Sequence, residues 1–347
     1  MSVTRRVAID PVDPDPALIA EAGAVIRRGG LVAFPTETVY GLGANAFDEA
    51  AVARIFAAKE RAASDPVIVH LAEASELGRV AAGVPPAARA LAERFWPGPL
   101  TLVLPKQPAI PANVTAGRPT VGIRVPRHPV ARAVIRAAGV PVAAPSANRF
   151  TRTSATLAEH VLDDLDGRVD LILDAGPAPL GIESTVVAVD DASVRMLRPG
   201  AVSAEEIAEV VAPLGIALRS GAVDASEAPG LLKRHYAPRA HLTVFHGPTE
   251  RAVPAALRHA ADELAAGRRV GALLADEDGP VPAGLVVERL GSRADLQAIA
   301  HHLFAALRRL DRAGVETIVA PTFGERGLGA ALLDRLTRAA EGRVIEV

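Results

Sequence analysis

The chain has 347 residues, of which 50% are hydrophobic and 22% are charged, a composition typical of a folded protein rather than a disordered one. Its net charge of -2 gives no overall field for nucleic acid, and the absence of cysteine excludes disulfides, thiolate nucleophiles and cysteine-ligated zinc. No run approaches the roughly 20 apolar residues of a membrane span and no secretory signal is recognisable, so we expect a cytoplasmic protein without membrane contact.

The length predicts two domains, since single hydrophobic cores usually stop growing before 347 residues. We place one domain at residues 1–212, a linker at 213–239 and a smaller domain at 240–347. The linker contains Gly, Ser and Pro residues and ends in the segment KRHYAP, whose cations and rings are unusual for a passive tether.

Helical and strand-like segments alternate in both domains, which predicts an α/β fold. In the first domain we expect helices at 16–28, 49–61, 85–95, 128–138, 157–165 and 203–212, and strands at 31–34, 67–69, 100–104, 120–125, 140–144, 171–174, 185–189 and 194–197. In the second we expect strands at 241–246, 269–274, 285–289 and 316–320, and helices at 249–266, 293–313 and 326–341. The first domain is then a twisted open sheet with flanking helices, and the second a small Rossmann-like parallel α/β domain.

The glycine-rich segment GLGANA at residues 41–46 matches a dinucleotide-binding pattern only superficially. The polar segment TETVY separates it from the preceding strand, and no long helix starts at its second glycine. We interpret it as a glycine turn rather than a nicotinamide site. A Walker-type phosphate loop is also missing from the sequence, so scattered side chains would have to hold any nucleotide.

Polar side chains follow several predicted strands at the point where each strand ends. Thr38 follows the strand at 31–34, His70 ends the strand at 67–69, and Ser146 and Asn148 follow the strand at 140–144. In open α/β sheets, ligands bind at such strand ends. Arg124 lies on a strand, and its planar guanidinium suits a carboxylate ligand.

Structural interpretations of the same residues remain open. Lys59 and Arg61 fall at a helix C-terminus, where cations commonly complement the helix dipole. A lone His at a strand end is usually structural, and Ser or Asn in a turn often bonds its own backbone. Trp96 is interpreted as a core or turn residue, and the pair His301 and His302 as surface. Arginines without a Ser-His-acid motif or metal-ligand spacing favour binding of phosphate and carboxylate over hydrolysis.

An ordered series of motifs resembles the YrdC-like L-threonylcarbamoyladenylate synthases in their long, two-domain form. The motifs are FPTETVYGLGANAF at 34–47, Lys59-x-Arg61, VIVHL at 67–71, TVGIR at 120–124, PSAN at 145–148, ESTVV at 183–187 and LRPG at 197–200. The resemblance covers essentially the whole chain and is strongest over residues 17–200. It implies a YrdC-like fold and a nucleotidyltransferase that converts L-threonine, bicarbonate and ATP into threonylcarbamoyl-AMP and pyrophosphate, for the N6-threonylcarbamoyladenosine of tRNA.

The resemblance also implies roles for individual residues. Threonine would be held by Thr38, His70, Arg124, the Ala144 backbone and Ser184, and ATP by Arg61, Asp65, Thr120, Ser146, Asn148, Ser154, Arg198 and Tyr236. Lys59 and Arg61 would be catalytic. Mg²⁺ is expected with ATP, held chiefly by its phosphates and not by a dedicated protein site. The position of Tyr236 implies that the linker lies over the active site.

Four residues depart from the family pattern. Ala62 and Ala155 stand where proline is common, Asp65 where asparagine is common, and Thr151 where glycine is common. Asp65 matters most, because a carboxylate repels ATP phosphates unless magnesium or an arginine intervenes.

The implied partners are a downstream tRNA threonylcarbamoyl transferase and tRNA itself. One alternative is a non-catalytic module that binds double-stranded RNA or tRNA. A second alternative, a carbamoyl-transferring relative that acts on another acceptor, would normally bring additional catalytic domains, and this chain has none.

Overall fold

The computed structural model describes residues 3–62, 64–219 and 235–347. Its backbone contacts divide the chain into two compact units. The first comprises Met1–Phe150, Ser154–Pro179 and Glu183–Leu231, and the second comprises Thr151–Thr153, Leu180–Ile182 and Leu232–Val347. The predicted boundaries around a linker at 213–239 stay a prediction, and residues 220–234 of that linker lie outside the described residues.

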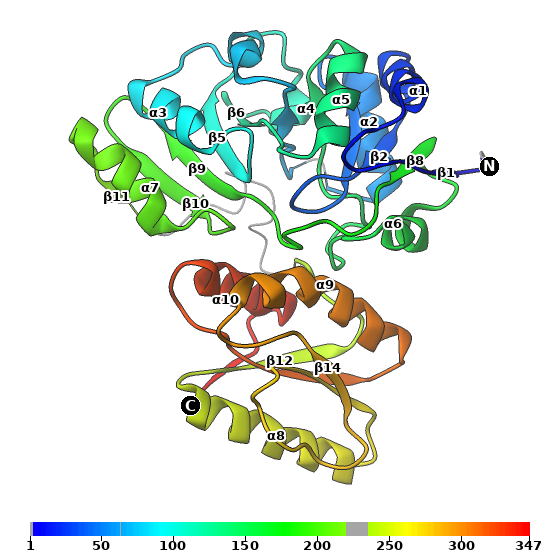
Figure 1. Cartoon of the computed structure of the whole chain (residues 1–347), viewed down its shortest axis with the longest axis vertical. Coiled ribbons are helices and arrows are strands. Elements are labelled where there is room, and N and C mark those ends of the chain that lie inside the picture. The colour runs from blue at the N-terminus through cyan, green and yellow to red at the C-terminus, as the bar shows by residue number, and fades with distance from the viewer. Residues whose placement is uncertain (1–2, 63, 220–234) are drawn as a thin grey trace. The chain divides into compact units, whose positions relative to one another are not determined.

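The described part of the first unit contains a mixed sheet of 11 strands (Figure 1). The strands follow the order β1-β8-β2-β3-β7-β4-β6-β5-β9-β10-β11. Their bounds are β1 (Arg5–Ala8), β2 (Val32–Phe34), β3 (Gly41–Asn45), β4 (Val69–His70), β5 (Leu100–Pro105), β6 (Thr120–Arg124), β7 (Val142–Ala143), β8 (Leu171–Asp174), β9 (Thr185–Val189), β10 (Val194–Arg198) and β11 (Leu218–Arg219). This sheet confirms the twisted, YrdC-like α/β fold expected for the first domain.

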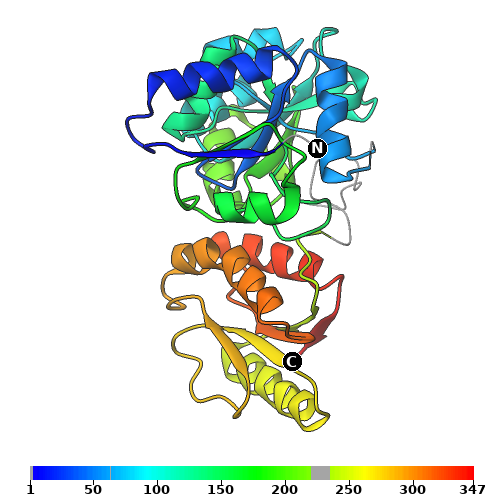
Figure 2. The same ribbon diagram turned by 90° about the vertical axis from the view of Figure 1, so that its right-hand side faces the viewer.

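Helices cover both faces of this sheet, and in the side view α1 and α2 lie on opposite sides of β2 (Figure 2). The α-helices are α1 (Pro16–Arg27), α2 (Glu49–Lys59), α3 (Pro86–Phe95), α4 (Ala112–Thr115), α5 (Pro129–Ala138), α6 (Ala158–Leu165) and α7 (Ala204–Val211), with 3₁₀ turns η1 (Ala74–Arg79) and η2 (Ala212–Leu214). Val32 and Phe34 belong to the apolar cluster beneath α1 and α5. Leu31 and Ala33 belong to the cluster beneath α2, α3, α6 and α7. Alternate residues of one strand therefore build the two cores, as the two-residue period requires.

Local signals explain where α2 begins. The Asp48 side chain accepts hydrogen bonds from the Ala50 and Ala51 backbone N–H groups at 3.0 and 3.1 Å. A carboxylate in this position satisfies N–H groups that have no partner inside the helix. Asp48 is therefore the N-terminal cap of α2.

The interpretation of GLGANA as a glycine turn is wrong. Gly41–Asn45 forms strand β3, which pairs antiparallel with β2 and with β7. A Cβ atom on Gly43 would lie 2.5 Å from Cε1 of Phe34, whereas a Cβ on Gly41 would lie 3.5 Å from its nearest neighbour, the Cβ of Ala144. Gly43 is therefore required because an aromatic ring packs directly on the strand, and not because a turn needs it.

The second unit contains a five-stranded parallel sheet in the order β14-β13-β15-β12-β16. Its elements are β12 (His241–His246), α8 (Thr249–Ala265), β13 (Val270–Leu274), β14 (Val286–Arg289), α9 (Leu296–Arg312), β15 (Thr317–Pro321), α10 (Leu328–Ala339) and β16 (Val344–Glu346). Parallel strands joined through helices confirm the Rossmann-like fold expected here. The short strands β1, β11 and β16 and the short helix α4 were not expected from the sequence.

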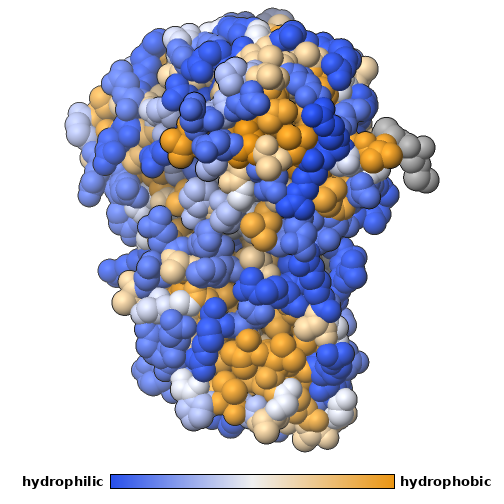
Figure 3. Space-filling view, turned by 45° about the vertical axis from the view of Figure 1, so that its right-hand side comes forward, coloured by the Kyte–Doolittle hydropathy of each residue, from blue (hydrophilic) through white to orange (hydrophobic). Residues whose placement is uncertain are grey.

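Apolar side chains in both units are mostly buried, although some remain partly accessible. In the space-filling view, hydrophilic residues cover most of the visible face, and hydrophobic residues gather in separate patches (Figure 3). In the part of the chain that the structure describes, none of the helices has the length and apolar character needed to cross a membrane.

Candidate active site

The residues expected to hold threonine come from neighbouring strands of the first unit. His70 on β4 is aligned with Arg124 on the parallel strand β6. The Ala144 N–H donates to the Ile68 carbonyl at 3.0 Å, which keeps the chain after β7 beside β4. Ser184 lies next to β5, because its hydroxyl is 2.8 Å from the Thr101 hydroxyl. Sheet pairing therefore brings together residues that are far apart in the sequence.

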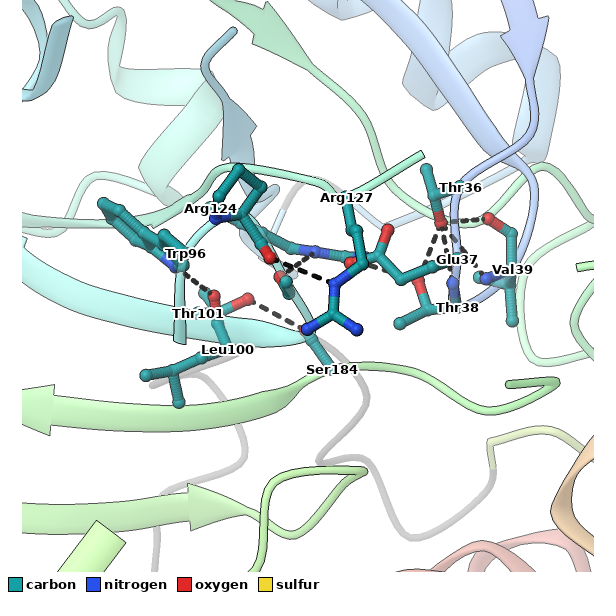
Figure 4. A network of polar contacts seen from close by, with 12 residues as sticks. Thr36, Glu37, Thr38, Val39, Trp96, Leu100, Thr101, Arg124, Arg127 and Ser184 are labelled. Atoms are coloured by element: carbon teal, nitrogen blue, oxygen red, sulfur yellow. Dashed lines mark hydrogen bonds and ion pairs between the residues drawn. The ribbon is translucent and has the colours of Figure 1, made fainter. Parts of the chain in front are cut away.

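Arg124 is buried and held from two sides (Figure 4). Its Nε donates to the Gly98 carbonyl at 3.2 Å, and its Nη1 donates to the Thr38 hydroxyl at 2.9 Å. Its Nη2 lies 2.8 Å from Oε1 of Glu37, and both of these side chains are less than a tenth exposed. The guanidinium is thus fixed in position before any ligand arrives, which favours specific recognition of a planar anion.

A local hydrogen-bond network shapes the loop that carries Thr38. The Thr36 hydroxyl donates to the Val39 carbonyl at 2.6 Å and lies 2.8 Å from the Thr38 hydroxyl. The N–H groups of Thr38 and Val39 in turn donate to the Thr36 oxygen. This compact turn, drawn in Figure 4, directs the Thr38 hydroxyl towards Arg124.

His70 is neutral at ordinary pH. Burial, followed by the nearby Arg124 charge, lowers its pKa from 6.5 to about 3. Its Nδ1 lies 3.3 Å from the Ile68 carbonyl, which can only accept, so Nδ1 carries the proton. An uncharged imidazole can bind a ligand by a hydrogen bond but cannot supply a counter-charge.

Arg198 contacts the backbone and side chain of Ser184. Its Nε and Nη2 donate to the Ser184 carbonyl at 3.2 and 2.9 Å, and Nη2 also reaches the Ser184 hydroxyl at 3.2 Å. A residue expected to bind ATP is therefore joined directly to a residue expected to bind threonine. This contact connects the two predicted subsites.

Lys59 organises the turn that carries Ser146 and Asn148. Its buried ammonium donates to the backbone carbonyls of both residues at 2.5 Å. The Asn148 amide donates to the Arg149 carbonyl at 2.9 Å. The Lys-x-Arg and Ser-x-Asn motifs thus form one structural assembly, and a direct role of Lys59 in catalysis stays a prediction.

Arg61 and Asp65 form a buried ion pair, with Nη2 and Oδ2 2.9 Å apart. Burial raises the pKa of Asp65, while the charges of Arg61, Lys59 and Arg198 oppose that rise. These three cations therefore lie within electrostatic reach of one carboxylate. A carboxylate at position 65 was expected to repel ATP phosphates unless a magnesium ion or an arginine lay beside it. Arg61 is that arginine, and its charge offsets the charge of Asp65.

The remaining residues expected to bind ATP are more dispersed. The Ser154 hydroxyl donates to the buried Glu183 carboxylate at 2.5 Å. Thr120 lines a recess together with Thr101 and Gly122. Tyr236 belongs to the second unit, where its ring stacks on Phe304 at 5.5 Å between ring centroids. An ATP contact of Tyr236, and a linker lying over the site, stay predictions.

Two buried carboxylates were not assigned to either substrate by the sequence analysis. Glu37 contacts Arg124, and Glu183 accepts from Ser154. Both lie inside the family motifs, directly beside Thr38 and Ser184. Their position at strand ends was a usable signal, but their charge partners follow only from the folded chain.

The expectation that Mg²⁺ accompanies ATP stays a prediction. Across residues 3–62, 64–219 and 235–347, no group of three or more His, Asp or Glu side chains is arranged to hold a metal ion. Asp65 and Glu37 each face an arginine. In proteins, Mg²⁺ commonly keeps several waters and binds through substrate phosphates and one or two carboxylates.

Comparisons with known proteins give matches along most of the chain. A family model described as "Telomere recombination" matches residues 24–200, and one described as "Threonylcarbamoyl-AMP synthase, C-terminal domain" matches residues 202–341. The threonylcarbamoyl-AMP synthase of Bacillus subtilis is 44% identical to this chain over 99% of both sequences. The chain belongs to the threonylcarbamoyl-AMP synthase family.

Other members of this family span similar lengths. The Pyrococcus abyssi threonylcarbamoyl-AMP synthase is 44% identical over 94% of this chain and 95% of its own length. The solved structure of P. abyssi Sua5 complexed with L-threonine matches with a TM-score of 0.91 and 41% identity, covering 100% of both chains. Both units of the fold are therefore shared with these relatives.

Proposed function

We propose that this chain is a threonylcarbamoyl-AMP synthase that converts L-threonine, bicarbonate and ATP into threonylcarbamoyl-AMP and pyrophosphate. The observation that carries the proposal is the fixed, buried guanidinium of Arg124 beside Thr38, His70 and Ser184, joined through Arg198 to the cationic region around Arg61. The first group suits an amino acid, and the second suits phosphates. Family membership over nearly the whole chain supports the same reaction.

The proposed reaction has two steps. The threonine amine first combines with bicarbonate to form a carbamate, and water leaves. A carboxylate oxygen of the carbamate then attacks the α-phosphorus of ATP, and pyrophosphate leaves. Arg124 orients threonine through its carboxylate, and Arg61 and Arg198 offset the negative charge that develops on the phosphates. The enzyme thus acts mainly by positioning its substrates and neutralising charge.

The partners of the reaction follow from its chemistry. Mg²⁺ would accompany ATP and reduce the negative charge of its phosphates. The acyl-adenylate product would pass to a tRNA threonylcarbamoyl transferase in the cytoplasm, and tRNA is a further candidate partner. A non-catalytic RNA-binding module is the alternative. Such a module would need an arginine cluster on one side but no threonine-binding residues, and the residues expected to bind threonine are present in this sequence.

The test is pyrophosphate release from ATP by the purified protein, measured with and without L-threonine and bicarbonate. Release should require both co-substrates and should fall at least about 100-fold in Arg124→Ala, because a charge-assisted carboxylate contact is lost. Arg127→Ala is the matched control, since Arg127 is exposed nearby and donates to the Pro97 carbonyl. Binding of threonine without turnover in the wild type would contradict the proposal and favour the RNA-binding alternative.

A further inference from the structure

Glu37 is a buried carboxylate with an unusual lack of hydrogen bonds. Its Oε1 lies 2.8 Å from Nη2 of Arg124, but neither of its oxygens accepts a hydrogen bond from a described residue. Nη2 of Arg124 likewise makes no hydrogen bond within the described part of the chain. Buried polar atoms are normally hydrogen-bonded, so two such groups side by side indicate a place where a ligand completes the bonding.

Arg124 neutralises Glu37 only while no ligand carboxylate is bound to that guanidinium. Arg124 is the adjacent cation, but its other nitrogens already donate to Gly98 and Thr38. His128 lies within electrostatic reach of Glu37, yet burial lowers the pKa of His128, so this imidazole is uncharged near pH 7. Its Nδ1 accepts from the Val130 N–H at the start of α5. A ligand whose carboxylate pairs with Arg124 would therefore leave Glu37 without a counter-charge, unless the same ligand also carries a cationic group.

The chemistry of an α-amino acid matches this pair of charges. Its carboxylate and its ammonium group are joined to the same carbon atom, so they must meet a cation and an anion that are themselves adjacent. Arg124 supplies the cation. Of the residues expected to hold threonine, Thr38, Ser184 and the Ala144 backbone are uncharged, and His70 is neutral, so they cannot supply the anion.

We propose that Glu37 is a further substrate-binding and catalytic residue, which binds the α-ammonium group of L-threonine and accepts the proton that this group must lose. The inference rests on the proposed function. An ammonium group has no lone pair, so it becomes nucleophilic only after it is deprotonated. The Glu37 carboxylate takes one proton, and the nitrogen lone pair forms the N–C bond to the bicarbonate carbon. The C–O bond to the bicarbonate hydroxyl breaks, and that hydroxyl leaves as water with a second proton from nitrogen.

The decisive experiment compares two ligands in two proteins. L-threonine and (R)-3-hydroxybutanoate, which is threonine without its amino group, are titrated against the wild type and Glu37→Gln by calorimetry. We expect Glu37→Gln to weaken L-threonine binding by about 10- to 100-fold, as for loss of a charged hydrogen bond, and to change hydroxybutanoate binding by less than about threefold. Equal weakening of both ligands would mean that Glu37 only orients Arg124, and would overturn the inference while leaving the proposed function intact.

Two further measurements keep the test decisive. If Glu37→Gln does not fold, the wild type alone decides, because equal affinity for the two ligands would overturn the inference. At saturating threonine, Glu37→Asp should retain a larger share of kcat than Glu37→Gln, since it keeps a proton acceptor. Equal kcat in both variants would overturn the proton-transfer role.

Failure of the wild type to bind L-threonine at all would overturn the proposed function, and this inference with it.

Discussion

At the scale of single residues, burial decides the protonation state of His70. Its folded-state pKa of about 3 lies below the ordinary value of 6.5, so the unfolded chain binds a proton more readily than the folded chain does. The stabilising contribution of neutral His70 is therefore fully present above pH 6.5 and is lost as the pH falls from 6.5 towards 3.

This titration gives a measurable prediction for His70→Gln. When the pH falls from 7 to 5, the wild type should lose about 2 kcal/mol more of its free energy of unfolding than the variant does, because glutamine does not titrate. Denaturant unfolding at several pH values measures this change. A constant difference between the two proteins across this range would mean that His70 titrates normally in the folded state.

Thr151 shows why a departure from the family pattern has a structural meaning. Its φ angle is +64°, in the left-handed region that favours glycine and strains a β-branched residue. The resemblance predicted glycine as the common residue here, and the backbone explains that preference. The other departure with a clear account is Asp65, whose charge is offset by Arg61.

At the scale of elements, β3 shows how a glycine pattern can be misinterpreted from sequence. Gly43 allows close packing of Phe34 against the strand, and neither glycine of β3 serves a turn or a phosphate loop. The two glycines of β3 differ in this respect. A Cβ atom added at Gly43 would overlap the Phe34 ring, whereas one added at Gly41 would not.

A matched pair of substitutions tests this account. Gly43→Ala should lower the free energy of unfolding by about 1–3 kcal/mol, as expected for overpacking, whereas Gly41→Ala should change it by less than about 1 kcal/mol. Thermal or denaturant unfolding of the two variants gives the comparison. Similar losses in both would show that backbone conformation, and not contact with Phe34, requires glycine in this strand.

At the scale of the whole molecule, the second unit includes short segments from the first half of the sequence. Thr151–Thr153 and Leu180–Ile182 belong to it. Arg308 on α9 donates to the Thr153 carbonyl at 2.5 Å, and the Ala237 N–H donates to the Thr151 carbonyl at 2.8 Å. The C-terminal half therefore fixes the backbone immediately before Ser154, a residue expected to bind ATP.

We predict that a chain ending at residue 228 loses at least about tenfold in turnover, because the backbone before Ser154 loses these partners. Arg308→Ala should reproduce part of the loss as a higher KM for ATP. Arg309→Ala is the matched control, since Arg309 is exposed and pairs with Glu288. Pyrophosphate release measures all three proteins, and full activity of the shortened chain would show that the second unit is dispensable for the reaction.

Much of the fold could be predicted from local patterns. Periodicity located α8, α9 and α10 and the strands between them. Two strands are shorter than predicted, because β4 covers only Val69–His70 and β7 covers only Val142–Ala143. The motifs of the first domain, ordered along the chain, identified the family that the comparisons then confirmed.

The sequence by itself thus determined the α/β class, the order of most elements and the set of candidate site residues, because periodicity, capping and motifs are local properties of the chain. Only the tertiary structure decided what those residues touch. Lys59 bonds carbonyls 87 and 89 residues away, and Arg124 bonds a hydroxyl 86 residues away. Contacts of this kind depend on strand pairing and packing between distant segments, and no local pattern specifies them.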